Sequence, residues 1–347
     1  VIVTDFDGNV VENPKTYTVD WDASAAEKGG WDSFMDKEIH EDPAAVQRTL
    51  LGRFDTNGGI TLDEVRIDEH DFKAIDKIIV VACGTASYAG QVAKYAIEHW
   101  VRIPVEIELA HEFRYRDPIL TPRTLVVAIS QSGETMDTLM ALRHAREQGS
   151  KVLAICNTQG ASIPRESDAV LYTHAGPEVA VASTKAFVAQ ITAAYLLGLY
   201  LAQVKGAMFR DEIHQMLDSL KDMPRKIQWV LDTQPKTIQA AAERMVNANS
   251  FLFLGRHVGY PVALEGALKL KEIAYTFTEG FAAGELKHGP IALVDEGEPV
   301  VFIVPPQRGR NVLHAKVISG IEEVKARGAY IIAVAEQGDP DVERYAD

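Results

Sequence analysis

Short apolar runs alternate with stretches of helical periodicity through the first part of the chain. We predict strands at the apolar runs 78–82, 104–110, 124–130, 151–157 and 168–174. Residues 134–149, ETMDTLMALRHAREQG, have the periodicity of a helix, with Met136 and Leu139 on one face and Gly149 at the end. Because these strands are apolar on both faces and alternate with helices, they indicate a parallel sheet that helices cover on both sides.

The same order of elements returns toward the C-terminus. Residues 249–275 repeat the strand, glycine loop and helix that begin at 78. Residues 299–336 repeat the strand, loop, helix, glycine and strand that begin at 125. We therefore predict an α/β fold with two tandem copies of one unit, joined by a helical piece at about 206–242. The second copy stops soon after its last predicted strand, so we expect it to be C-terminally incomplete.

The N-terminal part has a different pattern. Residues 1–12, VIVTDFDGNVVE, predict two short strands around a DGN turn, and two strands alone do not form a stable fold. Residues 29–50 have helical periodicity interrupted at Pro43, and a polar, turn-rich stretch follows. We predict a remnant of a removed domain at 1–19, a connector with a helix at 20–72 and a first α/β domain at 73–205. A helical connection at 206–244 and a second, incomplete α/β domain at 245–347 follow.

Composition narrows the class of protein. The net charge of −14 over 347 residues, without a basic run, argues against a nucleic-acid partner. The two cysteines, Cys83 and Cys156, end apolar runs, which is typical of buried free thiols in a reducing compartment and predicts a cytoplasmic location. The apolar stretch 186–204 is nearly long enough to cross a membrane, but Gln190 and Thr192 interrupt it. We predict a buried helix there and no membrane partner.

A cluster of hydroxyl side chains lies where an apolar strand ends and a helix begins. Ser130, Ser132 and Thr135 surround Gly133, and Gln131 adds an amide. Ligands of parallel sheets bind at this edge, where the free amides and the dipole of a helix N-terminus favour an anion. The loop has neither a GxxxxGK[ST] nor a GxGxxG pattern, so we predict a small phosphate ester rather than a nucleotide. The alternative is that Ser130 only caps the helix.

Two further loops carry hydroxyls in the same half of the chain. CGTAS places Thr85 and Ser87 after the first strand, and VASTKAF places Ser183 and Thr184 before the long apolar helix, with one of them as its cap. The alternative for both loops is simple helix capping. PPQRGR, the counterpart of SQSGET in the second half, has no hydroxyl, so we assign the ligand loops chiefly to the first half.

A row of charges and one histidine are the candidates for acid–base chemistry. Glu265, Lys269 and Glu272 are spaced to share one face of a helix. An exposed, salt-bridged stripe is the alternative, although the apolar residues on both sides favour a cleft. His288 lies in AAGELKHGP, where the Gly and Pro that follow would fix its position, and its alternative is a structural or solvated histidine.

The ordered motifs CGT, SQSGET, VASTKAF, ALEGALKLKE and AAGELKHGP resemble the isomerase half of glucosamine-6-phosphate synthases, the glutamine–fructose-6-phosphate aminotransferases. GGWDSFMDKEIHE is similar to the segment that joins their glutaminase and isomerase halves. The resemblance implies two sugar isomerase (SIS) domains, each a flavodoxin-like parallel sheet, and a homodimer without metal or organic cofactor. It implies transfer of ammonia from glutamine to fructose 6-phosphate, followed by isomerisation to glucosamine 6-phosphate.

The resemblance also assigns roles to individual residues. The residues implied to bind the sugar phosphate, or to line its pocket, are Thr85, Ser130, Gln131, Ser132, Thr135, Val181 and Ser183. Glu272 corresponds to the base that moves a proton between C1 and C2, and Lys269 to a lysine of the same pocket. His288 corresponds to the residue that opens the sugar ring from the partner subunit. A histidine titrates near neutral pH, and a carboxylate serves as a base when burial raises its pKa.

The sequence departs from the family's pattern at three places. It starts at Val1 without the N-terminal cysteine nucleophile, so we expect no glutamine hydrolysis by this fragment. The tail with the imine-forming lysine is absent after Asp347, so we expect sugar-phosphate binding with poor conversion. Ala86 stands where many members have serine.

Three rival functions remain open. Another SIS sugar-phosphate isomerase or deglycase would share the phosphate loop but lack the connector. A non-catalytic sugar-phosphate sensor would carry a basic helix-turn-helix, which this acidic chain does not show. A purely structural dimerisation module would have no use for Glu272 and His288.

Overall fold

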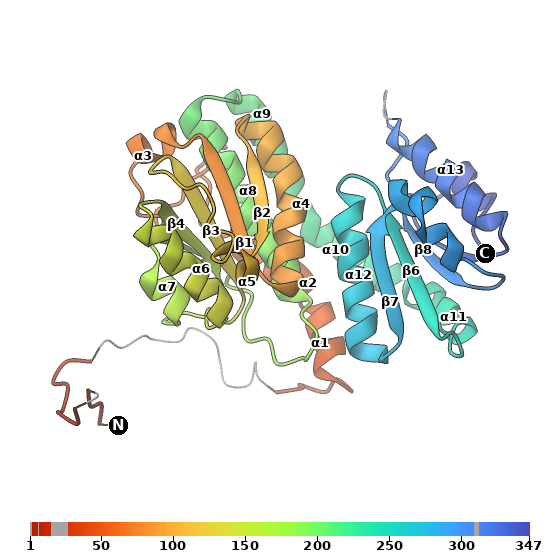
Figure 1. Cartoon of the computed structure of the whole chain (residues 1–347), viewed down its shortest axis with the longest axis horizontal. Coiled ribbons are helices and arrows are strands. Elements are labelled where there is room, and N and C mark those ends of the chain that lie inside the picture. The colour runs from red at the N-terminus through yellow and green to blue at the C-terminus, as the bar shows by residue number, and fades with distance from the viewer. Residues whose placement is uncertain (1, 6, 15–26, 309–311) are drawn as a thin grey trace.

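The computed structural model describes residues 2–5, 7–14, 27–308 and 312–347, and it contains two parallel sheets with helices around them (Figure 1). The strands of the first sheet, in the spatial order β2-β1-β3-β4-β5, are β1 (Lys77–Ala82), β2 (Val105–Leu109), β3 (Thr124–Ser130), β4 (Lys151–Cys156) and β5 (Ala169–Tyr172). All neighbouring pairs are parallel. This strand order is the flavodoxin-like one, so the predicted α/β class is confirmed.

The helices of the first half pack on both faces of this sheet. They are α4 (Gly84–Val101), α5 (Ala110–Phe113), α6 (Met136–Glu147), α7 (Ser162–Glu166) and α8 (Lys185–Lys205). Side chains alternate between the faces, as in every strand. Ile78 and Val80 of β1 join the core beneath α4 and α8, whereas Ile79 and Val81 join the core beneath α5, α6 and α7. Burial on both faces explains why these strands are continuous apolar runs.

The second half repeats this plan with a smaller sheet. Its elements are β6 (Ser250–Gly255), α12 (Gly259–Ala274), β7 (Phe277–Ala282), the 3-10 helices η2 (Ala283–His288) and η3 (Pro290–Leu293), β8 (Pro299–Ile303), α13 (Leu313–Lys325), β9 (Tyr330–Val334) and α14 (Pro340–Glu343). The parallel order β7-β6-β8-β9 corresponds to that of the first four strands of the first sheet. The sequence did not predict β7, because FTEGFA mixes charged, small and aromatic residues on a sheet edge.

Helices also precede and connect the two sheets. They are α1 (Phe34–His40), α2 (Asp42–Leu50), α3 (Glu69–Ala74), α9 (Arg210–Lys221), α10 (Met223–Thr233) and α11 (Pro235–Arg244). Pro43 lies in the first turn of α2, as the predicted interruption requires. The predicted N-terminal hairpin is a single antiparallel bridge between Thr4 and Val10 rather than two strands. The predicted boundary between residues 19 and 20 lies outside the described residues.

Helix α8 is long and apolar enough to cross a membrane, and 61% of its apolar window is buried inside the first half. It packs along α4, where Gly198 makes the close approach possible. A β-carbon at Gly198 would lie 2.8 Å from Ile97 Cγ1 and 3.3 Å from Trp100 Cε3. Core helices of water-soluble proteins pass the same length test, and the packing of α8 matches the predicted buried helix.

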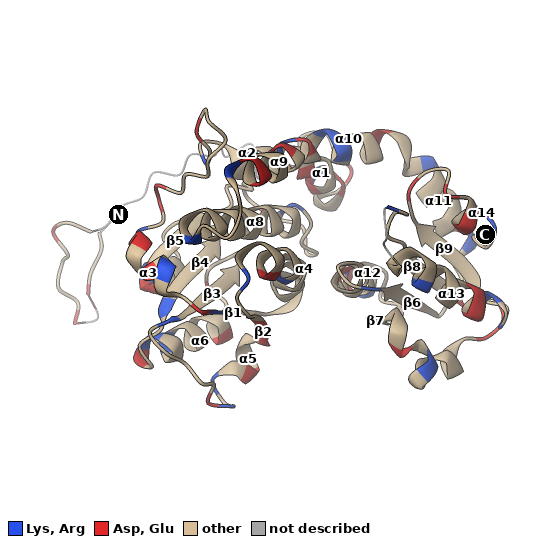
Figure 2. Ribbon diagram, turned by 90° about the horizontal axis from the view of Figure 1, so that it is seen from above, with Lys and Arg blue, Asp and Glu red and all other residues tan. Residues whose placement is uncertain are grey.

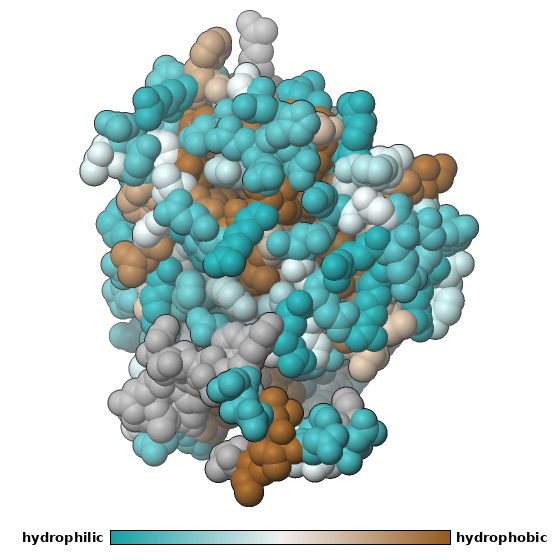
Figure 3. Space-filling view, turned by 90° about the vertical axis from the view of Figure 1, so that its left-hand side faces the viewer, coloured by the Kyte–Doolittle hydropathy of each residue, from teal (hydrophilic) through white to brown (hydrophobic). Residues whose placement is uncertain are grey.

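The two halves lie side by side, and α4 and α12 pack against each other between them. Figure 2 shows α9, α10 and α11 running from one half to the other along one side of this contact. Figure 3 views the outer side of the first half, where hydrophilic residues cover most of the surface. The elements that face each other are therefore the first helix of each α/β unit.

Candidate functional site

The candidate site lies where the C-terminal end of β1 and the start of α4 approach helix α12 of the second half. Thr85, in the first turn of α4, donates a hydrogen bond from Oγ1 to Oε1 of Glu265 on α12, over 3.0 Å. This bond joins residues 180 positions apart and ties the ligand edge of the first sheet to the charged face of α12. Two of the predicted groups of site residues are thereby brought together.

The loop after β3 is tightly folded around Ser130. The buried Ser130 Oγ accepts a hydrogen bond from Gly133 N at 3.0 Å and lies 3.1 Å from Thr135 Oγ1. Gly133 has φ +70°, and a β-carbon there would lie 2.6 Å from Ala161 Cβ and 2.8 Å from Cys156 Sγ. Only glycine fits this backbone position without displacing its neighbours. Ser130 bonds within the loop, so the alternative in which it caps the helix is wrong.

The start of α6 has features of an anion site. Its N-cap is Thr135, which makes no side-chain capping bond, so the first helical amides keep their donors for a ligand. Ser132 is exposed, and its Oγ accepts a hydrogen bond from Glu134 N at 3.2 Å. The hydrogen bond from Ser162 lowers the pKa of Glu134, whose carboxylate turns toward the start of α7. The helix dipole and the hydroxyls favour an anion of modest charge here.

The charged row of α12 meets the first half at Glu265. Lys269 Nζ lies 2.8 Å from Glu272 Oε2 and 3.5 Å from Glu265 Oε1. Glu265 is only 6% exposed, and its Oε2 has no hydrogen-bond partner among the described residues. Burial raises the pKa of Glu265, against the opposing effects of Lys269 and Thr85. The row is therefore an ion triad that is buried at Glu265 and partly open at Lys269 and Glu272, and the exposed-stripe alternative is wrong.

Three of the predicted site residues lie apart from this triad or point to solvent. His288 ends η2 and is exposed, and its turn packs against β7, η3 and α13. No hydrogen bond or ion pair within the described chain joins it to Lys269 or Glu272. Val181 is 97% exposed. Ser183 donates a hydrogen bond from Oγ to Glu178 Oε1 at 3.1 Å.

The start of α8 is capped by a residue that sequence reasoning missed. The N-cap is Thr184, one of the two predicted residues, but its side chain makes no capping bond. The carboxylate of Glu178 instead accepts hydrogen bonds from Thr184 N at 3.1 Å and Ala186 N at 3.2 Å. Because Glu178 reaches the helix across a loop, the spacing rules for caps could not identify it.

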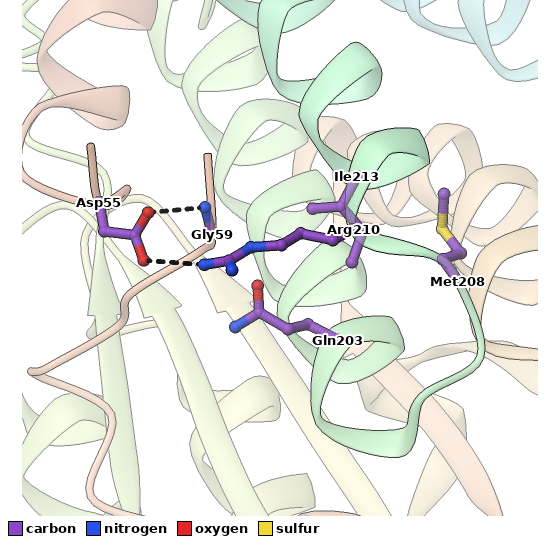
Figure 4. Close-up of a pocket in the computed structure, with 6 residues that line it drawn as sticks. All are labelled: Asp55, Gly59, Gln203, Met208, Arg210 and Ile213. Atoms are coloured by element: carbon purple, nitrogen blue, oxygen red, sulfur yellow. Dashed lines mark hydrogen bonds and ion pairs between the residues drawn. The ribbon is translucent and has the colours of Figure 1, made fainter. Parts of the chain in front are cut away.

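A pocket of about 260 Å³ lies at the opposite edge of the first sheet (Figure 4). Its lining residues are Asp55, Gly59, Gln203, Met208, Arg210 and Ile213. Close to it, Lys205 donates to the carbonyls of Lys73 and Ile75 just before β1, which places this pocket where the strands begin. Its polar groups already have partners: Arg210 lies 3.8 Å from Asp55, and the Gln203 amide bonds to the backbone of Ile60. We assign it a structural role in closing the turn between Asp55 and Gly59.

One group among the described residues has the geometry of possible metal ligands. The ligand atoms of His314, Asp339 and Asp341 lie within 4.8 Å of one another. His314 Nε2 and Asp339 Oδ2 already form a 2.7 Å pair that ties α13 to the start of α14. We assign this group to packing of the second half.

Comparison with known proteins identifies the family. The SIS domain model matches residues 72–200 and 244–347. The glutamine–fructose-6-phosphate aminotransferase [isomerizing] of Corynebacterium diphtheriae is 68% identical over 345 residues, which are 99% of this chain and 55% of that protein. The corresponding protein of Mycobacterium tuberculosis is 58% identical over 350 residues, with 99% and 56% covered. The chain thus spans about half the length of the curated relatives it matches.

Solved structures agree with this assignment. The C-terminal domain of glucosamine-fructose-6-phosphate aminotransferase from Francisella tularensis has a TM-score of 0.85 and 39% identity, covering 92% of this chain and 88% of that one. Tagatose-6-phosphate ketose/aldose isomerase from Escherichia coli, at 18% identity and TM-score 0.70, covers 93% and 86% and shares the fold. The chain belongs to the SIS domain family, in the group formed by the isomerizing glutamine–fructose-6-phosphate aminotransferases.

Proposed function

We propose that this chain forms the sugar-phosphate isomerase part of an enzyme that converts fructose 6-phosphate and glutamine-derived ammonia to glucosamine 6-phosphate. The observation that carries the proposal is the triad Glu265–Lys269–Glu272, held by Thr85 against the ligand edge of the first sheet. The names of the relatives, and their match along the whole chain, support the same reaction.

In this proposal the first half binds the phosphate ester. The amides at the start of α6 and the hydroxyls of Ser132 and Thr135 donate to the phosphate oxygens. Gln131, Thr85, Val181 and Ser183 border the same ligand. Ser130 contributes indirectly, because its hydroxyl holds the backbone of Gly133 in place.

The second half performs the proton transfer. Glu272, the more open carboxylate of the triad, takes a proton from one of C1 and C2 and returns it to the other. Lys269, 2.8 Å from Glu272, stabilises the negative charge that develops on the substrate oxygen. The buried Glu265 holds Lys269 from the other side and accepts the hydrogen bond of Thr85.

His288 requires a second subunit in this scheme. We propose a homodimer in which His288 of one chain opens the sugar ring at the site of the other. Helices α10 and α11 support an assembly, because neither has a fully buried residue while Trp229, Val230 and Ile238 are exposed. We propose that any glutamine hydrolysis takes place outside the segment that this chain spans, which is 55% of the length of the relative from Corynebacterium diphtheriae. The free thiols Cys83 and Cys156 favour a cytoplasmic location.

The test is to locate the phosphate of bound glucose 6-phosphate in crystals of the protein. We expect it within hydrogen-bond distance of the Ser132 and Thr135 hydroxyls, with C1 and C2 facing Glu272. A phosphate at the Asp55–Arg210 pocket, or a sugar ring turned away from Glu272, would contradict the proposal. Isomerisation without ammonia transfer in the intact protein would instead favour another SIS isomerase.

A further inference from the structure

The connection between β5 and α8 carries two residues of the proposed sugar site, Val181 and Ser183, yet it has no regular secondary structure. Residues 173–184 therefore cannot rely on a helix or strand ladder to satisfy their backbone groups. Their position depends on side chains from elsewhere in the chain. The helices α1 and α2, which precede the first sheet in sequence, supply most of these side chains.

Glu38 of α1 holds the middle of this connection. Its side chain is 2% exposed, and Oε1 accepts hydrogen bonds from Val179 N at 2.6 Å and Ala180 N at 3.1 Å. Charge-assisted bonds from a carboxylate to backbone amides are stronger than neutral ones. The two amides lie immediately before Val181, so Glu38 sets where the chain enters the proposed sugar site.

Glu178 holds the end of the same segment. Its Oε1 accepts from Ser183 Oγ, Thr184 N and Ala186 N, at 3.1–3.2 Å. Between them, Glu38 and Glu178 therefore satisfy the polar groups on both sides of Val181. The exposed side chain of Val181 and the hydroxyl of Ser183 owe their places to the buried Glu38 and the half-buried Glu178.

The surroundings of these carboxylates are costly for stability. Glu38, Glu41, Asp42 and Glu178 form an acidic cluster around Lys185, which is 1% exposed and forms an ion pair with Glu41. Among the described residues, Glu38 Oε2 and Asp42 Oδ1 are buried without a hydrogen-bond partner. Burying unpaired carboxylate oxygens destabilises a fold. Lys37 also pairs with Glu41, at 3.7 Å, but four acids beside two lysines still exceed what stability alone would need, so the arrangement points to a positional role.

A second set of contacts from α2 offers an internal control. Thr49 Oγ1 donates to Thr173 O at 2.6 Å, and Arg48 donates to the carbonyls of His174 and Ala175 at 2.9 Å. These bonds hold the beginning of the same connection, several residues before Val181. They stabilise the packing of α2 on the first half without touching the segment next to the proposed sugar site.

We infer that Glu38 is a positioning residue for sugar-phosphate binding, acting through the Val179 and Ala180 amides on the segment that carries Val181 and Ser183. This inference rests on the proposed function, because it deepens the description of that site. Glu38 does not touch the substrate. Its carboxylate orders the loop before the ligand arrives, so that ligand binding does not bear the cost of ordering it.

The test compares Glu38→Ala, Glu38→Gln and Thr49→Val in the intact protein. The probe is glucose 6-phosphate, with the Kd measured by calorimetry, the Tm of each variant and amide hydrogen exchange over 177–184. Glu38→Ala should raise the Kd about tenfold and speed exchange at Val179 and Ala180, because both amides lose their acceptor. Glu38→Gln keeps an acceptor oxygen and should stay within about threefold of the parent. Thr49→Val should lower the Tm with the Kd within about twofold.

Equal Kd values for Glu38→Ala and the parent protein would overturn the inference, as would equal weakening by Thr49→Val. A Glu38→Ala variant that binds weakly while exchange at Val179 and Ala180 stays as in the parent would show that Glu38 does not act through these amides, which also contradicts the inference. If Glu38→Ala does not fold, the inference is tested on Glu38→Gln, by its Kd for glucose 6-phosphate and by amide exchange at Val179 and Ala180. A parent protein that binds no glucose 6-phosphate defeats the proposed function instead, whereas exchange at Val179 and Ala180 still tests whether Glu38 holds the loop.

Discussion

The two halves of the molecule have the same plan but contribute different chemistry. After β3 the first half places Ser130, Ser132 and Thr135, whereas after β8 the second half places Val304, two prolines, Gln307 and Arg308. Conversely, α4 directs the hydroxyl of Thr85 toward α12, and α12 presents two carboxylates and a lysine. The first half thus offers neutral hydrogen-bond donors for an anion, and the second half offers titratable side chains.

The halves also differ in how completely their strands are buried. Strands β1, β3 and β4 are buried almost throughout, whereas β6 is partly buried and Phe277 at the start of β7 is 65% exposed. The side chains of strands covered on both faces are closely packed, so these strands have little freedom to move. The comparison teaches that the more completely packed half holds the loops proposed to bind the phosphate, while the more open half carries the groups proposed to react.

The strongest way to break this division is to remove the titrating group from the second half. Glu272→Gln should reduce kcat for conversion of fructose 6-phosphate by about 10³-fold with a small change in KM, since the amide cannot accept the proton. Glu279→Gln, on the exposed surface of β7, is the matched control and should behave as the parent protein. Near-normal turnover by Glu272→Gln would show that Glu272 is not the base.

The rigidity of the first half is tested at its glycine loop. Gly133→Ala should lower the free energy of unfolding by about 2–4 kcal/mol, because the new methyl group meets Ala161 and Cys156 in a left-handed backbone position. Gly149→Ala has a similarly positive φ but open space around it, so it should cost only about 1 kcal/mol. Denaturant unfolding measures both. Equal losses would mean that strain alone, and not close packing, limits this loop.

The assignment of the phosphate to the first half is sharpened by removing its hydroxyls. Ser132→Ala combined with Thr135→Ala should raise the KM for fructose 6-phosphate about tenfold or more, with kcat less affected, because two phosphate donors are lost. Gln307→Ala in the corresponding loop of the second half should leave the KM unchanged. Steady-state kinetics measure both variants. A raised KM for Gln307→Ala with an unchanged KM for the double variant would place the anion site in the second half.

The smallest expected effect concerns the acidic cluster that ties α2 to the first half. Burial and the nearby Glu178 raise the pKa of Asp42 from 3.8 to about 7. The folded protein therefore holds this proton more tightly than the unfolded chain, so stability should fall as the pH rises from about 4 to about 7 and then level off.

The measurement is the Tm of the parent and Asp42→Asn across this pH range. In Asp42→Asn the loss of stability between pH 4 and pH 7 should be smaller than in the parent, by on the order of 1 kcal/mol, since the burial of Asp42 is incomplete. Asp32→Asn, on the exposed segment before α1, should not change the slope. Parallel curves for the parent and Asp42→Asn would show that Asp42 stays ionised over the whole range.

Much of the fold could be predicted because its signals are local. The apolar runs predicted β1 to β6, β8 and β9, and Pro43 predicted the break between α1 and α2. Strand β7 escaped prediction, because an edge strand with glycine and glutamate lacks both alternation and a continuous apolar run. The N-cap position of α8, Thr184, could be predicted, but its hydrogen-bond acceptor could not, since Glu178 reaches these amides from an irregular loop.

By itself, the sequence determined the two α/β units, the hydroxyl loop and the one-faced charge row, because periodicity and glycine placement act within a few residues. Only the tertiary structure decided which acid would be buried and which would stay open to a ligand. Glu265 is buried through a bond to Thr85, 180 positions away, and Glu38 reaches Val179 over 141 positions. Contacts over such separations depend on how whole helices pack, and no local pattern in the chain encodes them.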